Sequence, residues 1–324
     1  MKKQQLLCLL FGLVLSITAI AGDSPQEKEF RIAASVGDTE TMAKLLEAGV
    51  DVNSANKFGK TALMMAIEND NLEATALLLA RGADVNRRTV AGCTALTFAA
   101  ENGHDALTAL LLERGADLDA RTRAGWDALT IASRYGLTDI VEQLLDKGAD
   151  PNAPDRNGRT ALMHAAETGH PDTVAMLVKG GARLEARDKD GATALIIAAD
   201  KGHAKVVDRL LKLGADVNAV DNDGASALIW AVGQDHVTAA EHLIDQGADI
   251  NLQDADGVTA LMEAASVRSQ DLVRLLLDRG ADPMIRDSRG RTALDIARKR
   301  RNRQVIEMLQ DAMERMKQNQ DPSG

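Results

Sequence analysis

Residues 155–187 read DRNGRTALMHAAETGHPDTVAMLVKGGARLEAR, and the same pattern recurs along the chain with a period equal to the length of this stretch. Glycine marks the pattern in two places, and each series of eight glycines keeps one constant interval, the step from Gly59 to Gly92. A fixed period of this size indicates one supersecondary unit stacked on copies of itself. One series is Gly59, Gly92, Gly125, Gly158, Gly191, Gly224, Gly257 and Gly290, and the other is Gly49, Gly82, Gly115, Gly148, Gly181, Gly214, Gly247 and Gly280.

The unit itself predicts two short helices and a projecting loop. Residues 155–158 have the composition of a turn closed by glycine, and the hydroxyl of Thr160 is placed to cap a helix at 161–168. A second helix is expected from Pro171 to just before Gly181, because proline favours the first helical turn and glycine the C-terminal end. The sequence therefore predicts an all-α solenoid of helix-turn-helix units with projecting β-hairpin-like loops.

Three short motifs within the unit resemble the ankyrin repeat. The resemblance covers about Glu29 to Leu309 and implies the fold of that family. The family usually has Pro after the capping Thr and His after the Leu, whereas this chain always has Ala in the first place and never His in the second. We therefore expect the Thr–His hydrogen bond of the family to be absent. The motifs are Gly-Lys-Thr-Ala-Leu at 59–63, Gly-Ala-Asp-Val-Asn at 82–86 and 214–218, and Gly-His at 103–104, 169–170 and 202–203.

The chain divides at the repeat boundaries. In the last unit Arg298 and Gln310 replace apolar residues of the other units, and a polar outer face keeps a terminal repeat soluble. We expect the chain to lose order from Gln318 onward. The expected parts are a signal peptide at 1–21, an ankyrin-repeat domain at 22–319 and a disordered tail at 320–324. The domain would hold an N-terminal cap at 22–55, repeats at 56–88, 89–121, 122–154, 155–187, 188–220, 221–253 and 254–286, and a C-terminal cap at 287–319.

The first residues have the layout of a secretory signal. A basic start at Lys2 and Lys3 precedes an uncharged apolar run, and small residues at Ala19 and Ala21 suit a signal peptidase. The apolar run is short for a membrane span, although an uncleaved N-terminal anchor is the alternative. We expect a bacterial protein that is periplasmic or secreted and has no contact with the membrane after cleavage.

Composition argues against several classes of function. A formal net charge of -10 disfavours nucleic acid and anionic membranes as partners. The basic run at 298–301 could suggest a nucleic-acid patch, but it is better explained as a solvated cap surface near a helix end. The chain has no glycine-rich phosphate loop, nucleophile elbow or Cys/His pair. We expect no enzyme activity and no cofactor.

The histidines and one glutamate are the remaining candidates for a catalytic or metal-binding site. His164 and Glu263 occupy a phase that is apolar in other repeats, and we expect both to be partly exposed at a groove. They lie three repeats apart and cannot act as a pair. The remaining histidines of interest share one phase after the first helix, so they are expected to be structural and cannot converge on a metal ion. These are His104, His170, His203 and His236.

Cleavage after Ala21 would remove Cys8 and leave Cys93 as the single cysteine, which excludes an internal disulfide. We expect its thiol to stay free, with pairing to another chain as the alternative. By the resemblance, loop tips and the exposed side of the first helices line a concave face, and Cys93 falls on it. No metal site is expected.

The same face predicts where a partner binds. Trp126 and Tyr135 belong to one repeat and are flanked by Arg123 and Arg134, and aromatic residues with nearby arginine are typical of interface hot spots. Alternatively, Trp126 covers a neighbouring loop. An acidic line on the first helices either meets a basic partner or keeps the surface soluble. It consists of Glu68, Glu101, Glu167 and Asp200. The candidate partner-binding residues are Phe58, Val90, Arg123, Trp126, Arg134, Tyr135, Arg156, Arg159, Glu68, Glu101 and Glu167.

These features predict a monomeric, non-enzymatic scaffold for protein–protein interaction. We expect a periplasmic protein that binds, sequesters or inhibits a protein partner. A secreted effector that binds host proteins is the alternative, and an unrecognised enzyme is a lesser one.

Overall fold

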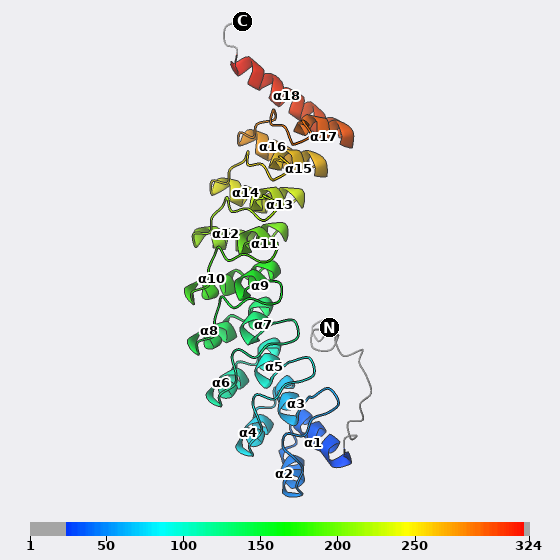
Figure 1. Cartoon of the computed structure of the whole chain (residues 1–324), viewed down its shortest axis with the longest axis vertical. Helices are drawn as coiled ribbons and strands as arrows, with labels where there is room; N and C mark the ends of the chain where they lie inside the picture. The colour runs from blue at the N-terminus through cyan, green and yellow to red at the C-terminus, as the bar shows by residue number, and fades with distance from the viewer. Residues whose placement is uncertain (1–23, 321–324) are drawn as a thin grey trace. The chain divides into compact units, whose positions relative to one another are not determined.

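The computed structural model describes residues 24–320, and their regular structure is helical (Figure 1). The predicted signal peptide and residues 321–324 of the predicted tail lie outside the described residues. Within residues 24–320 the loops form two isolated antiparallel β-bridges, Ala55 with Thr61 and Val220 with Ser226, and no longer strand. None of the helices described there combines the length and the apolar character needed to cross a membrane. The predicted all-α class with hairpin-like loops is confirmed.

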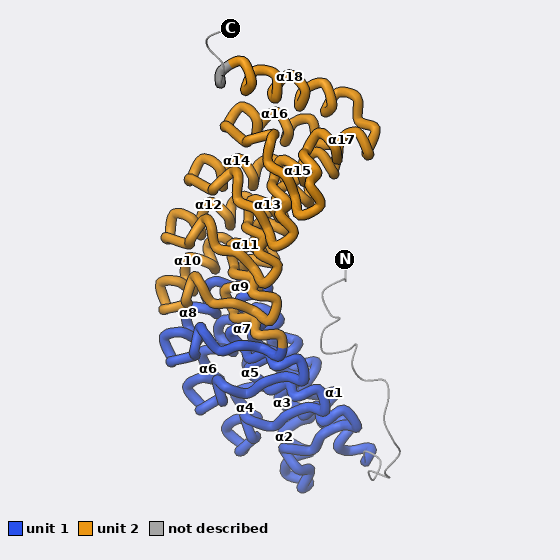
Figure 2. Tube along the Cα trace, turned by 45° about the horizontal axis from the view of Figure 1, so that its top comes forward, with its two compact units in different colours: residues 1–156 blue, residues 157–324 orange. Residues whose placement is uncertain are grey.

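The described residues form two compact units, 24–156 and 157–320 (Figure 2). In unit 1 the first helix of each repeat packs beside the first helix of the next repeat, and the second helices pack together in the same way. Its first helices are α1 (Pro25–Val36), α3 (Ala62–Glu68), α5 (Ala95–Asn102) and α7 (Ala128–Tyr135). Its second helices are α2 (Thr39–Glu47), α4 (Leu72–Ala80), α6 (Asp105–Glu113) and α8 (Thr138–Asp146).

Unit 2 repeats this arrangement in its own stack. Its first helices are α9 (Ala161–Thr168), α11 (Ala194–Asp200), α13 (Ala227–Gly233), α15 (Ala260–Val267) and α17 (Ala293–Arg300). Its second helices are α10 (Pro171–Lys179), α12 (Ala204–Lys212), α14 (Val237–Asp245), α16 (Gln270–Asp278) and α18 (Arg303–Gln320).

A hydroxyl or carboxylate caps most of the first helices, as the sequence predicts. The amide of Met64 donates to the hydroxyl of Thr61 at 3.4 Å, and the amide of Ile196 donates to Thr193 at the same distance. Thr160 has the same extended cap backbone, with φ -89° and ψ 168°, but its hydroxyl has no hydrogen bond within the described chain. The predicted cap bond of Thr160 is therefore wrong. Its counterparts already lie near the upper limit of hydrogen-bond length, so a small rotation is enough to lose it.

The core of each unit is built from the leucine that follows each first-series glycine by four positions. All eight are buried, and paired alanines such as Ala99 and Ala100 let neighbouring first helices approach closely. The leucines are Leu63, Leu96, Leu129, Leu162, Leu195, Leu228, Leu261 and Leu294.

The C-terminal helix is longer than the sequence predicts. We expected order to be lost from Gln318, yet α18 continues to Gln320. Met308, Ala312 and Met316 recur every four residues along this helix and are half-buried. They line a hollow together with residues of α16, so apolar contact extends the helix beyond the repeat boundary.

Candidate functional site

In both units the tip of each hairpin loop is hydrogen-bonded to the tip of the next. In unit 1 the amide of Val90 donates to the carbonyl of Phe58 at 2.8 Å, and Arg123 donates to Ala91 at 2.8 Å. Gly92 permits this approach, because it has φ +82° and a Cβ there would lie 2.9 Å from the carbonyl oxygen of Arg121. We refer to the hairpin tips and first helices of a unit as its first-helix face.

Two large apolar side chains are exposed at the hairpin tips of unit 1. Phe58 is 48% exposed and Val90 is 54% exposed, and their loops are adjacent. The ammonium of Lys57 lies 5.0 Å from the centre of the Phe58 ring. The tips therefore present an apolar patch with a cation beside it.

Trp126 is half-buried, and its surroundings settle how its ring is held. The indole nitrogen donates to Oδ2 of Asp155 in the following loop at 3.0 Å. The guanidinium carbon of Arg134 lies 5.3 Å from the ring centre, within the range of a cation–π contact. The indole edge of Trp126 is thus bonded to a neighbouring loop, as the alternative expects, and the ring contacts Arg134. Binding of a partner through these two residues stays a prediction. Tyr135 ends α7 and is half-buried.

Three carboxylates of the predicted acidic line, Glu68, Glu167 and Asp200, are each ion-paired with a cation. In unit 1 the ammonium of Lys60 is ion-paired with Glu68, and in unit 2 the guanidinium of Arg159 is 2.9 Å from Glu167. Asp200 is 2.8 Å from the adjacent lysine. The long cationic side chains of Lys60 and Arg159 each stand just before the first helix that carries their carboxylate. These ion pairs could have been predicted from the sequence, because a cationic residue just before a first helix occurs together with a glutamate near the end of the same helix.

The predicted partner-binding residues differ in how much of each side chain reaches solvent. The exposed ones are Phe58, Val90, Arg123 and Arg156, and the half-buried ones are Glu68, Glu101, Trp126, Arg134, Tyr135, Arg159 and Glu167.

Two side chains that we placed on the surface are buried. Cys93 is 1% exposed, because it occupies the phase of Lys60 and Arg159 but is too short to emerge from under the loop. His164 is 2% exposed, because its ring fills the place taken by the buried Phe98 and Ile131 in unit 1. Both expectations of exposure are wrong. The burial of Cys93 also removes the basis for its pairing with another chain.

Burial of Cys93 predicts a protected thiol. In a Cys8→Ser variant, Ellman's reagent should label Cys93 slowly in buffer and completely in denaturant, since a thiol reacts only when it is accessible. The measurement is the rate of absorbance change with and without urea. Complete labelling within seconds in buffer would contradict the burial.

Glu263 in α15 is half-buried, as expected from its phase. Burial raises the pKa of Glu263 above its ordinary value of 4.5, the nearby charge of Asp254 raises it further, and Arg300 opposes the shift. The folded chain therefore holds a proton at pH values where the unfolded chain has lost it. Ionisation of Glu263 costs stability as the pH rises above 4.5.

A Glu263→Gln variant tests this pH dependence. The free energy of unfolding of the wild type should fall relative to the variant between pH 4.5 and neutral pH. Urea unfolding of both proteins at the two pH values gives the difference. The same difference at both pH values would show that Glu263 titrates normally.

Two histidines at the junctions between helices connect neighbouring repeats of unit 2. The Nε2 of His203 is 3.0 Å from the carbonyl oxygen of Glu167, and that of His236 is 3.0 Å from the carbonyl oxygen of Asp200. These contacts confirm the structural role predicted for them.

The comparison with protein families gives four overlapping matches to a single model, which is described as ankyrin repeats in three copies. The matches cover residues 30–122, 115–188, 180–254 and 228–320. A comparison with curated proteins found no match.

Proposed function

The chain belongs to the ankyrin repeat family, whose repeats form protein–protein interaction modules, and we propose that it is an exported, non-enzymatic protein that sequesters a protein partner. The first-helix face of unit 1 is the proposed contact surface. Repeat proteins of this kind bind through extended surfaces shared by several repeats.

The observation that carries the proposal is the apolar patch at adjacent loop tips. Phe58 and Val90 expose about half of their surface although the helices behind them bury their leucines completely. Exposed apolar side chains that gather in one place indicate an interaction site. Arg134 and Trp126 lie in the same unit and add the arginine and aromatic side chains enriched in binding hot spots.

Export is supported by the basic and apolar N-terminal sequence. Periplasmic extraction followed by N-terminal sequencing tests it, and the expected mature chain begins at Gly22. Recovery of the intact chain in the membrane pellet would favour the uncleaved anchor. Recovery in the culture medium would favour the effector that binds host proteins.

Co-purification tests the function itself. The tagged chain is recovered from the periplasm after mild crosslinking, and the proteins bound to it are identified by mass spectrometry. A Phe58→Ala/Val90→Ala variant serves as the control for the surface, and Leu72→Ala, exposed on a second helix of unit 1, serves as the matched control. One protein should be recovered with the wild type and Leu72→Ala but not with the double variant. Equal recovery by all three chains would contradict the proposal.

A further inference from the structure

The first-helix face of unit 2 contains a hollow between two neighbouring repeats. Its volume is about 590 Å³, and α13, α15 and the two loops beside them form its walls. The residues that matter for its chemistry are Ala225, Trp230, Gly233, Asp254 and Glu263.

Another repeat of unit 2 shows what fills the corresponding place. There Arg159 reaches across to the next loop, and its Nε donates to Oδ2 of Asp188 at 3.2 Å. Its Nη1 donates to Oε1 of Glu167 at 2.9 Å. In this repeat a guanidinium of the chain itself therefore lies between two carboxylates.

The hollow keeps one of those carboxylates but has no guanidinium. One repeat period relates Asp188 to Asp221, and a second relates Asp221 to Asp254. The same two steps relate Arg159 to Ala225 and Glu167 to Gly233. Small residues therefore stand where the long ion-paired side chains lie in the other repeat. Their shortness creates the hollow.

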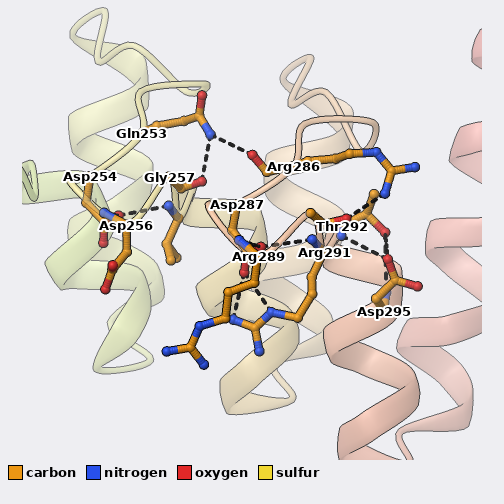
Figure 3. A network of polar contacts seen from close by, with 12 residues as sticks. Gln253, Asp254, Asp256, Gly257, Arg286, Asp287, Arg289, Arg291, Thr292 and Asp295 are labelled. Atoms are coloured by element: carbon orange, nitrogen blue, oxygen red, sulfur yellow. Dashed lines mark hydrogen bonds and ion pairs between the residues drawn. The ribbon is translucent and has the colours of Figure 1, made fainter.

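Asp254 is left with an unused oxygen. Its Oδ1 accepts the amides of Asp256 at 2.9 Å and Val258 at 2.8 Å, which fixes the carboxylate on its own loop (Figure 3). Its Oδ2 has no hydrogen bond or ion pair within residues 24–320. The outer oxygens of the other three turn aspartates of unit 2 are all engaged: Asp188 with Arg159, Asp221 with the indole nitrogen of Trp230, and Asp287 with Arg291.

Glu263 supplies the second carboxylate from the next repeat. Isoleucine stands at this phase in α11 and α17, so a charge here departs from the pattern. A Cβ on Gly233 would lie 3.8 Å from Oε2 of Glu263, which places this carboxylate beside the space that a side chain at 233 would occupy. The guanidinium of Arg300, the cation that acts on Glu263, donates to the hydroxyl of Ser266. Glu263 has no ion pair in the described part of the chain.

Trp230 gives the hollow an aromatic wall. Its indole nitrogen donates to Oδ2 of Asp221 at 2.7 Å, so the ring is fixed while it lines the hollow. Two more carboxylates, Asp223 and Asp256, lie on the lining loops and are exposed. A held indole beside several carboxylates attracts a planar cation through both the ring and the charge.

We propose that this hollow binds the guanidinium of an arginine side chain on the protein partner, between Asp254 and Glu263 and against Trp230. The inference rests on the proposed binding function and adds the chemistry that the partner must present. In the hollow the partner's arginine takes the place that corresponds to that of Arg159 in its own repeat. A planar, forked guanidinium suits two carboxylates better than an ammonium does.

A titration with a blocked peptide tests the hollow without the partner. The probe is acetyl-Gly-Arg-Gly-amide, and the control is the same peptide with citrulline, which has the shape of arginine but no charge. The readout is the indole N–H resonance of Trp230 in the full-length chain, with Trp126 as the internal reference. Arginine should shift Trp230 in a saturable way, and citrulline should bind at least about tenfold more weakly. Equal shifts with both peptides, or no shift of Trp230, would overturn the proposal.

Two variants locate the binding. Glu263→Ile introduces the residue of α11 and α17 and should abolish the shift while the thermal midpoint stays the same or rises. Ala225→Arg should fill the hollow from within, abolish the shift and raise the thermal midpoint. Ala192→Arg is its matched control, because the aspartate it would reach, Asp221, is already bound to Trp230. Peptide binding that persists in Glu263→Ile would contradict the assignment.

The titration and the co-purification fail independently. The resonance of Trp230 could stay unshifted while a partner is still captured through Phe58 and Val90. That result would remove the arginine site and leave the proposed function intact. If the arginine peptide shifts the resonance of Trp230 but no protein is captured, the proposed partner surface of unit 1 is removed instead.

Discussion

Leu162→Ala should lower the free energy of unfolding by about 2–5 kcal/mol. Leu162 lies in α9 of unit 2, and its side chain is among the largest that are fully buried in the described residues. Truncation removes apolar contacts and leaves a cavity that short, closely packed helices fill only in part. Urea unfolding followed by circular dichroism measures the loss.

Leu72→Ala is the matched control for this truncation. The same side chain is deleted from the exposed start of α4, and stability should change by no more than about 0.5 kcal/mol. Unfolding midpoints for Leu162→Ala and Leu72→Ala that coincide with the wild type would contradict the buried placement of Leu162.

The second large effect concerns binding. Phe58→Ala combined with Val90→Ala should weaken the partner complex by more than about 2 kcal/mol, a change of roughly thirtyfold in the dissociation constant. Both side chains are exposed at loop tips, so their truncation removes contacts with a partner and few within the fold. Isothermal titration with the purified partner measures the change.

Thermal unfolding provides the control for this variant. The midpoint should match that of the wild type, which separates a lost contact from a damaged fold. An unchanged dissociation constant would remove the loop tips from the contact surface.

The repeat architecture could be predicted from the sequence because each unit repeats the same local signals. Glycines at helix ends, polar N-cap residues and a leucine at a fixed position recur in the repeats, and each of these signals acts on residues close to it in the sequence. Positions whose state depends on side-chain length or on the next repeat could not be predicted in this way. Cys93 and His164 were placed at the surface by phase alone, but a short thiol and a ring packed against the core are both buried.

The candidate surface could be predicted only in part. Exposure of Phe58 and Val90 follows from the loop phase, whereas the hydrogen bond from Trp126 to Asp155 joins consecutive repeats and requires their spacing. The hollow of unit 2 has recognisable features in the sequence, but they lie in two different repeats. Ala225 and Gly233 are small where other repeats carry ion-paired side chains, and the charge of Glu263 enters from the following repeat.

Site-specific photocrosslinking tests the central claim most directly. A photoreactive amino acid is placed at Val90 on the first-helix face or at Leu72 on a second helix of the same unit, and cells are irradiated before extraction. We predict a single covalent protein adduct from position 90 and none from position 72. Adducts of equal yield from both positions, or an adduct from position 72 alone, would contradict binding through the first-helix face.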